Sequence, residues 1–264
     1  MANRRKVIKS AVGITTVGII SQSTKASKSD VGGIDQIGIS DEVEELLQTG
    51  KINQAEQLME SHGVNYSTKK LETGGDREFE AQGRYSESNS ELYMSLVEKN
   101  DNDDLYLVST YGTLSTRRAR IRDAAVIDDA CGIGWDSNEW TARGRNHLNY
   151  IANSDASGGA DIERTDFDAN YGVTWGVDLP RTLGDDTNIS LQADLYKTGP
   201  TDQAPVYFDY IHTYTFLGEG PFGIDIHVDI LDGSLGRLGI DLVDAYEAWD
   251  AELEVSKGED RDEW

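Results

Sequence analysis

The sequence predicts a mainly β fold of the α+β class, an antiparallel β-sandwich with a helical hairpin before it and an amphipathic helix after it. Apolar and polar residues alternate in several segments between residues 92 and 230, as in strands with one buried face. Short turn-forming stretches separate these segments, which favours a sandwich over a parallel α/β sheet. The single cysteine, Cys131, allows no intramolecular disulfide, so packing must supply the stability.

Residues 41–63 are predicted to form the helical hairpin. Asp41 and Glu44 have the spacing of a capping box, and apolar residues then recur at helical intervals. Gly50 and Gly63 suit the left-handed residues that commonly end helices. The pair could pack on the main domain or, alternatively, dock a partner.

The β-sandwich domain is expected over residues 88–256, after a polar connector at 64–87. We expect half-buried antiparallel strands connected as a meander. The alternating pairs of segments are 92–96 with 105–109, 173–179 with 189–195, and 206–216 with 222–230.

A terminal helix is predicted from Gly239 to Val255. Leu242, Tyr246, Trp249 and Leu253 have helical spacing, and acidic residues cover the remaining positions. A charged tail then follows at 257–264.

Residues 1–26 have the pattern of a targeting segment. Arg4 and Arg5 precede a weakly apolar stretch, and small residues near Ala26 suit cleavage before a linker at 27–40. The segment resembles a twin-arginine export signal, which implies the twin-arginine export machinery as a partner and an extracellular or cell-surface location. A retained tail or uncleaved anchor is the alternative. No later segment is long or apolar enough to suggest a transmembrane span in the mature protein.

The chain is strongly acidic, with 48 Asp and Glu residues and a net charge of −24. Because residues 1–26 carry five basic residues and no acid, the net charge of the rest falls to −29. Such a charge destabilises a compact state unless salt screens it. With its leader, the chain resembles an exported protein of extremely halophilic archaea. A calcium-rich or polycation-binding acidic protein is the alternative, and the sign of the charge argues against nucleic acid as a partner.

Three groups of residues are candidate sites. Alternation in Arg118, Arg120 and Arg122 would place three guanidinium groups on one side of a strand, where they could bind acidic groups of a surface polysaccharide or envelope protein. Pairing with the chain's own acids is the alternative, also for the nearby Arg143 and Arg145. Trp135 and Trp140 flank a polar turn that could bind a ligand or simply anchor a hairpin.

Asp225, His227 and Asp229 form the third group. On one face of a strand they could supply part of a divalent-cation site, but the solvated side of an outer strand is the preferred interpretation. No other cofactor is expected. Cys131 is interpreted as a buried apolar residue and not as a nucleophile, and the aromatic stripe from Phe208 to Phe216 as core or as a stacking platform.

The sequence contains no Gly-x-Ser-x-Gly elbow, phosphate-binding glycine loop or His-Glu-x-x-His pattern. We therefore expect a non-enzymatic binding or cell-surface module. The alternatives are a secreted carbohydrate-active hydrolase that uses paired carboxylates and a diffusible antagonist of the halocin type.

Overall fold

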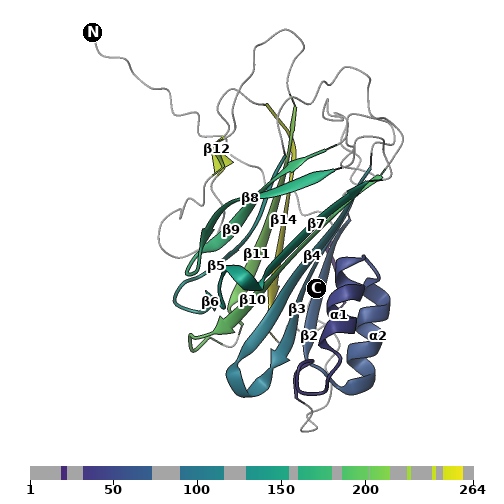
Figure 1. The fold of residues 1–264 in the computed structure, drawn as a ribbon, viewed down its shortest axis with the longest axis vertical. Helices are drawn as coiled ribbons and strands as arrows, with labels where there is room; N and C mark the ends of the chain where they lie inside the picture. The colour runs from purple at the N-terminus through teal and green to yellow at the C-terminus, as the bar shows by residue number, and fades with distance from the viewer. Residues whose placement is uncertain are drawn as a thin grey trace, which may run out of the picture.

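The computed structural model describes residues 19–22, 32–72, 90–115, 129–154, 160–179, 186–201, 203–214, 225–226, 240–241 and 246–257. Two antiparallel sheets pack together, and a pair of helices lies against the outer side of the larger one (Figure 1). The predicted β-sandwich with a helical hairpin is confirmed.

The larger sheet has the strand order β1-β2-β3-β4-β10, and the far edge of β10 pairs with β6 and then with β7. Its strands are β1 (Ile19–Gln22), β2 (Tyr66–Glu72), β3 (Glu91–Asn100), β4 (Leu105–Ser115), β6 (Trp140–Ala142), β7 (Leu148–Ser154) and β10 (Asp186–Lys197).

The smaller sheet has the order β14-β11-β5-β9-β8, and a separate short pair joins β12 to β13. The strands are β5 (Asp129–Trp135), β8 (Asp161–Asp168), β9 (Gly172–Asp178), β11 (Pro205–Tyr214), β12 (Asp225–Ile226), β13 (Ile240–Asp241) and β14 (Tyr246–Ser256).

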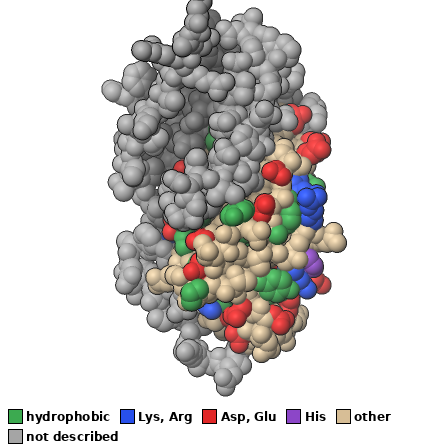
Figure 2. All heavy atoms as spheres, turned by 90° about the vertical axis from the view of Figure 1, so that its left-hand side faces the viewer, with side chains coloured by type: hydrophobic (Ala, Val, Ile, Leu, Met, Phe, Trp, Pro, Cys, Tyr) green, Lys and Arg blue, Asp and Glu red, His purple; other side chains and the backbone are tan. Residues whose placement is uncertain are grey.

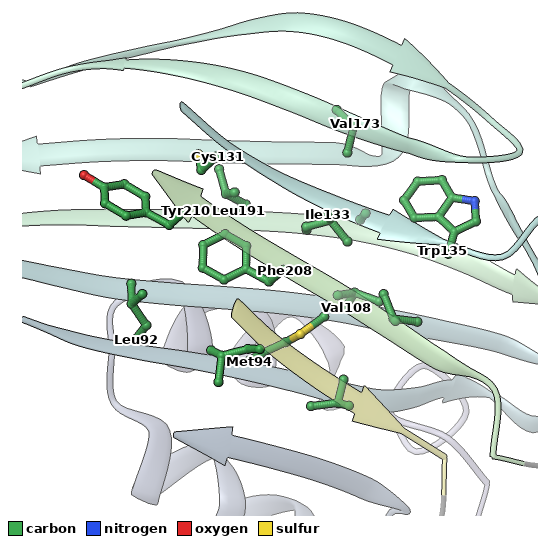
Figure 3. Close-up of a cluster of buried hydrophobic side chains, with 14 of the residues drawn as sticks. Leu92, Met94, Val108, Cys131, Ile133, Trp135, Val173, Leu191, Phe208 and Tyr210 are labelled. Atoms are coloured by element: carbon green, nitrogen blue, oxygen red, sulfur yellow. The ribbon is translucent and has the colours of Figure 1, made fainter. Parts of the chain in front are cut away.

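The main hydrophobic core lies between the two sheets (Figure 3). Leu92, Met94 and Leu191 of the larger sheet are fully buried and belong to the same cluster as Ile133 and Phe208 of the smaller one. Alternate residues of β3, β9, β10 and β11 face this layer, as the sequence pattern predicts.

The hairpin predicted across residues 99–104 is confirmed as β3 and β4, joined by a short 3-10 turn, η2 (Asp101–Asp103). Its strands are buried on both faces and not on one. Leu96 faces the core between the sheets, whereas Leu107 belongs to a second cluster beneath the helices. The helices α1 (Ser40–Gln48) and α2 (Ile52–His62) provide the cover that the strand pattern did not reveal.

The helix pair packs on the sheet, as one of the two interpretations expected. Val43 and Met59 are fully buried in the second cluster. Gly50 and Gly63 have φ values of 72° and 71°, which confirms the predicted left-handed helix ends. The predicted cap at Asp41 is wrong, because α1 begins one residue earlier and Asp41 lies in its first turn.

The predicted meander is only partly present: β1 to β4 are neighbours in chain order and β8 pairs with β9, but the other strands do not follow this order. β9 belongs to the smaller sheet, β10 to the larger one and β11 again to the smaller one. These three successive strands therefore alternate between the sheets, so that their apolar faces cover each other across the core. Periodicity specifies a buried face but not the sheet to which it belongs.

The predicted terminal helix is wrong over the described residues, because 246–256 form strand β14. Ala251, Leu253 and Val255 alternate toward the core while Glu252 and Glu254 are exposed. This two-residue period coexists with the helical spacing in the sequence. Pairing along the whole length of β11 decides in favour of the strand, since it satisfies the backbone groups at that edge.

Two predicted connecting segments are more ordered than expected. The connector at 64–87 contains β2, whose polar residues Thr68 and Lys69 are buried. In the linker at 27–40, Ile34 is fully buried and its backbone N–H donates to the carbonyl of Glu98. β1 lies within the predicted leader and pairs with β2. The strand predicted at 222–230 lies outside the described residues except for β12.

Candidate functional site

Trp135 and Trp140 are fully buried. The indole Nε1 of Trp135 donates to the carbonyl of Ala169 at 3.3 Å, and that of Trp140 donates to Ala204 at 3.2 Å. Neither ring offers a face to a ligand. This arrangement supports the hairpin-anchor interpretation of the turn between them.

Glu139, in the same turn, is held by a compact polar network. Its carboxylate lies 2.6 Å from Lys197 Nζ and accepts hydrogen bonds from the backbone N–H and the hydroxyl of Thr201. These hydrogen bonds lower the pKa of Glu139 below its ordinary value. Lys197 also lies 5.4 Å from the centre of the Trp140 ring. The network ties the β5–β6 turn to the end of β10.

Arg118, Arg120 and Arg122 lie outside the described residues. Of the neighbouring arginines, Arg143 places a guanidinium nitrogen 3.3 Å from Asp194, and Arg145 lies 5.5 Å from the centre of the Phe167 ring. These two arginines therefore contact the protein itself. Their placement supports the alternative of internal partners for this part of the arginine-rich segment.

A large bulge at residues 143–147, including the 3-10 turn η3 (Arg145–His147), positions Arg143. Ala142 pairs with Leu195 and Leu148 pairs with Ala193, so five residues stand opposite Asp194 alone. Bulges of this kind redirect side chains at sheet edges. Here the bulge brings Arg143 and His147 to the carboxylate of Asp194.

Asp194 is the centre of an ionic network on the helix side of the larger sheet. Lys99 Nζ lies 3.0 Å from Asp194 and 2.6 Å from Glu44 of α1. The pKa of Lys99 is raised by hydrogen bonds and attraction from these two carboxylates, which outweigh the opposing effect of its burial. The network joins α1, β3, β10 and the bulge, and its geometry indicates a structural role.

The third candidate group cannot be assembled from the described residues. Asp225 is described only as a backbone position in β12, where it pairs with Asp241, and His227 and Asp229 lie outside the described residues. Within the described ranges, no cluster of three or more His, Cys, Asp or Glu side chains has the arrangement of a metal site.

The interior position of Cys131 supports its interpretation as a core residue. Its side chain is fully buried, and burial raises the pKa of the thiol well above its ordinary range. Since the thiolate is the nucleophilic form, this cysteine is chemically quiet at neutral pH.

Asp129, Tyr210 and His212 form a buried polar cluster that sequence reasoning missed. Tyr210 and His212 alternate on β11 and face the core, and Asp129 begins the neighbouring β5. The Asp129 carboxylate accepts a hydrogen bond from the Tyr210 hydroxyl and lies 2.8 Å from His212 Nδ1. The sequence signal that could have revealed the cluster was Asp129 itself, an acid two residues before Cys131 and therefore on the same, apolar face of the strand.

The Asp129–Tyr210–His212 cluster has the carboxylate–imidazole contact that orients histidines in many catalytic sites. It lies inside the sandwich, where Asp129 and His212 are each only 2% exposed. Tyr210 and His212 also belong to the aromatic stripe, which the sequence left open as core or stacking platform. Its described inward-facing residues form core and not an exposed stacking platform.

Comparison with known proteins identifies no family. No family model and no curated protein matches the chain. A cohesin module of a family 33 glycoside hydrolase from Clostridium perfringens has 8% identity, covers 73% of this chain and 95% of its own, and gives a TM-score of 0.26. A pore forming protein has 8% identity, coverage of 72% and 88%, and a TM-score of 0.32.

A third solved structure concerns the pH-induced modulation of Streptococcus parasanguinis adhesion by Fap1 fimbriae, and its protein has 12% identity to this chain. It covers 75% of this chain and 90% of its own, with a TM-score of 0.28. Likeness this weak carries no argument about function. Among the described helices, none combines the length and hydrophobicity needed to cross a bilayer.

Proposed function

We propose that the chain is an exported, salt-adapted β-sandwich domain that acts as a non-enzymatic binding module at the cell surface. The leader with Arg4 and Arg5 supports export, and the net charge of −24 supports adaptation to high salt. The β-sandwich provides a rigid scaffold from which loops and sheet edges can bind partners.

The observation that carries the proposal is the division of the carboxylates into two populations. The buried carboxylates of Glu98, Asp129, Glu139 and Asp194 are hydrogen-bonded to groups of the fold. They are therefore occupied with internal contacts, which argues against their use as a catalytic pair.

The second population lies on the surface. Asp and Glu side chains are spread over the described face in Figure 2, and the acids of β8 are exposed. Repulsion among such charges falls when salt shortens the screening length to about 3 Å at 1 M. A hydrated acidic surface thus supports function in concentrated salt.

Arg118, Arg120 and Arg122 are the proposed contacts to an acidic ligand, such as a carboxylated or sulfated surface polysaccharide or an acidic envelope protein. Guanidinium groups bind carboxylate and sulfate with paired hydrogen bonds, which remain useful where long-range attraction is screened.

Fractionation of a haloarchaeal culture that expresses the full chain tests the proposal. We expect the protein outside the cytoplasm and mostly on washed envelopes. Replacing Arg4 and Arg5 by Lys should keep it in the cytoplasm, and unchanged export would refute the twin-arginine assignment. Free protein in the medium would instead favour the diffusible hydrolase or halocin-type antagonist.

The arginine contacts have a separate test. Combining Arg118→Ala with Arg120→Ala should release the protein from envelopes. Combining Arg145→Ala with Arg164→Ala removes the same charge at residues placed elsewhere, and should leave retention unchanged. If the Arg118→Ala and Arg120→Ala double variant stays on the envelopes as well as the control does, these two arginines do not contribute to binding.

A further inference from the structure

Strand β7 (Leu148–Ser154) forms an edge of the larger sheet without the usual protection of edge strands. Among the described strands it pairs only with β10. Its sequence, Leu-Asn-Tyr-Ile-Ala-Asn-Ser, contains no charged residue and no proline, although 27% of the chain is charged. Natural edge strands commonly carry charges or proline that discourage pairing with other chains.

The edge of the smaller sheet shows the contrast. β8 carries four exposed acids, and a register shift between Arg164 and Asp166 distorts its pairing with β9. These are the features that protect an edge. The exposed acids are Asp161, Glu163, Asp166 and Asp168. The uncharged edge at β7 therefore differs clearly from the acidic edge at β8.

Ile151 is the central residue of β7 and is apolar. It is only partly buried and belongs to neither hydrophobic cluster. It lies between Asn149 and Asn153 on the outer face of the sheet, and its partner on β10 is Ser190. An isoleucine in this position gains by packing against another apolar group.

We infer that β7 pairs antiparallel with β7 of a second copy of this chain, about a two-fold axis at Ile151. In this register Ile151 packs against its own counterpart, Asn149 faces Asn153, and Tyr150 faces Ala152. The strand is self-complementary in this way because asparagines stand symmetrically about its centre.

Charge favours a second copy as the occupant. Two molecules that each carry a net charge of −24 can approach closely only where neither presents acids, and β7 is an uncharged edge. Pairing joins the two larger sheets into one. Because a seven-residue strand makes a small interface, we expect association that depends on concentration and strengthens with salt.

Sedimentation of the full chain in molar salt tests the inference. The mass should rise from that of a monomer to twice that value as the concentration increases to about 1 mM. Ile151→Lys should remain monomeric, whereas Thr165→Lys on the exposed β8 edge should still associate. A monomeric wild type, or association of Ile151→Lys equal to that of wild type, would overturn the inference.

Cysteine cross-linking tests the register with variants that keep the edge uncharged. Ile151→Cys should form a disulfide-linked dimer under mild oxidation, because directly opposed residues have Cβ atoms about 5 Å apart. Asn149→Cys should not form this disulfide. Position 149 faces Asn153 of the second copy, so the two introduced cysteines lie about four residues apart along the paired strands. The native Cys131 is fully buried and does not interfere. Equal cross-linking of both variants would contradict the two-fold register.

Discussion

Asp129 shows how a single buried carboxylate can organise one part of the core. It is 2% exposed, and its two oxygens contact Tyr210 and His212. A carboxylate in such a position is tolerated only when polar partners replace its water. The cluster therefore specifies how β5 and β11 align, in addition to the pairing of their backbones.

Asp129→Ala should lower the free energy of unfolding by about 3 kcal/mol, because Tyr210 and His212 lose their shared acceptor inside the core. Denaturant titration in molar salt measures the change. Asp161→Ala, at an exposed edge position, should shift stability by less than about 0.5 kcal/mol. Equal effects at both sites would show that the buried contacts contribute nothing.

Glu139 and Glu98 are expected to affect the pH dependence of stability in opposite directions. Hydrogen bonds from Lys197 and Thr201 lower the pKa of Glu139 below 4.5, whereas burial raises the pKa of Glu98 above it. The contribution of Glu139 is thus present above pH 4.5 and is lost as the pH falls through its folded pKa. Ionisation of Glu98 costs stability as the pH rises above 4.5.

The isosteric variants Glu139→Gln and Glu98→Gln separate the two effects. The stability that wild type has over Glu139→Gln should shrink on acidification. Wild type should gain stability relative to Glu98→Gln over the same change. Unfolding curves measured at several pH values check both signs, and parallel curves for wild type and a variant would contradict the assigned shift.

The helix pair is the element that converts β3 and β4 into strands buried on both faces. Its two helices must turn tightly at Gly50, which has a φ of 72°. A side chain at Gly50 would also meet the ring of Tyr111 on β4. The position of Gly50 at a helix end was predicted correctly from the local sequence. The Tyr111 ring of the sheet beneath is a second reason why this position needs glycine.

Gly50→Ala should destabilise the protein by about 2 kcal/mol, because it combines an unfavourable positive φ with displacement of the Tyr111 ring. Gly38 has a φ of 76° but open space around its missing Cβ. Gly38→Ala is therefore the matched control and should cost only about 1 kcal/mol. Identical losses in thermal or denaturant unfolding would argue against the contact with Tyr111.

Acidity is a property of the whole molecule and supports the central expectation about salt. The wild-type chain should lose its cooperative fold in dilute buffer and regain it in molar sodium chloride, because screening reduces repulsion among its acids. Circular dichroism across a salt series measures the transition. Sucrose, which favours compact states without screening charge, should restore far less structure. Full folding in dilute buffer would contradict salt adaptation.

Prediction from sequence succeeded where the signal was local. Alternation placed Leu92 and Met94 on one face of a strand, and glycine positions marked both helix ends. It failed where a distant partner decides the outcome. Trp135 and Trp140 were compatible with a ligand turn or an anchor until their burial was known, and Asp129 had no visible partner because Tyr210 and His212 are far away in sequence.

By itself, the sequence determined the β-rich class, the helical hairpin and the acidic character, because strand period, helix period and charge are properties of neighbouring residues. The tertiary structure alone decided which sheet each strand joins and that residues 246–256 form a strand. It also decided that the buried acids have partners inside the fold. These outcomes depend on pairing between distant segments, where burial and backbone hydrogen bonds outweigh local propensity.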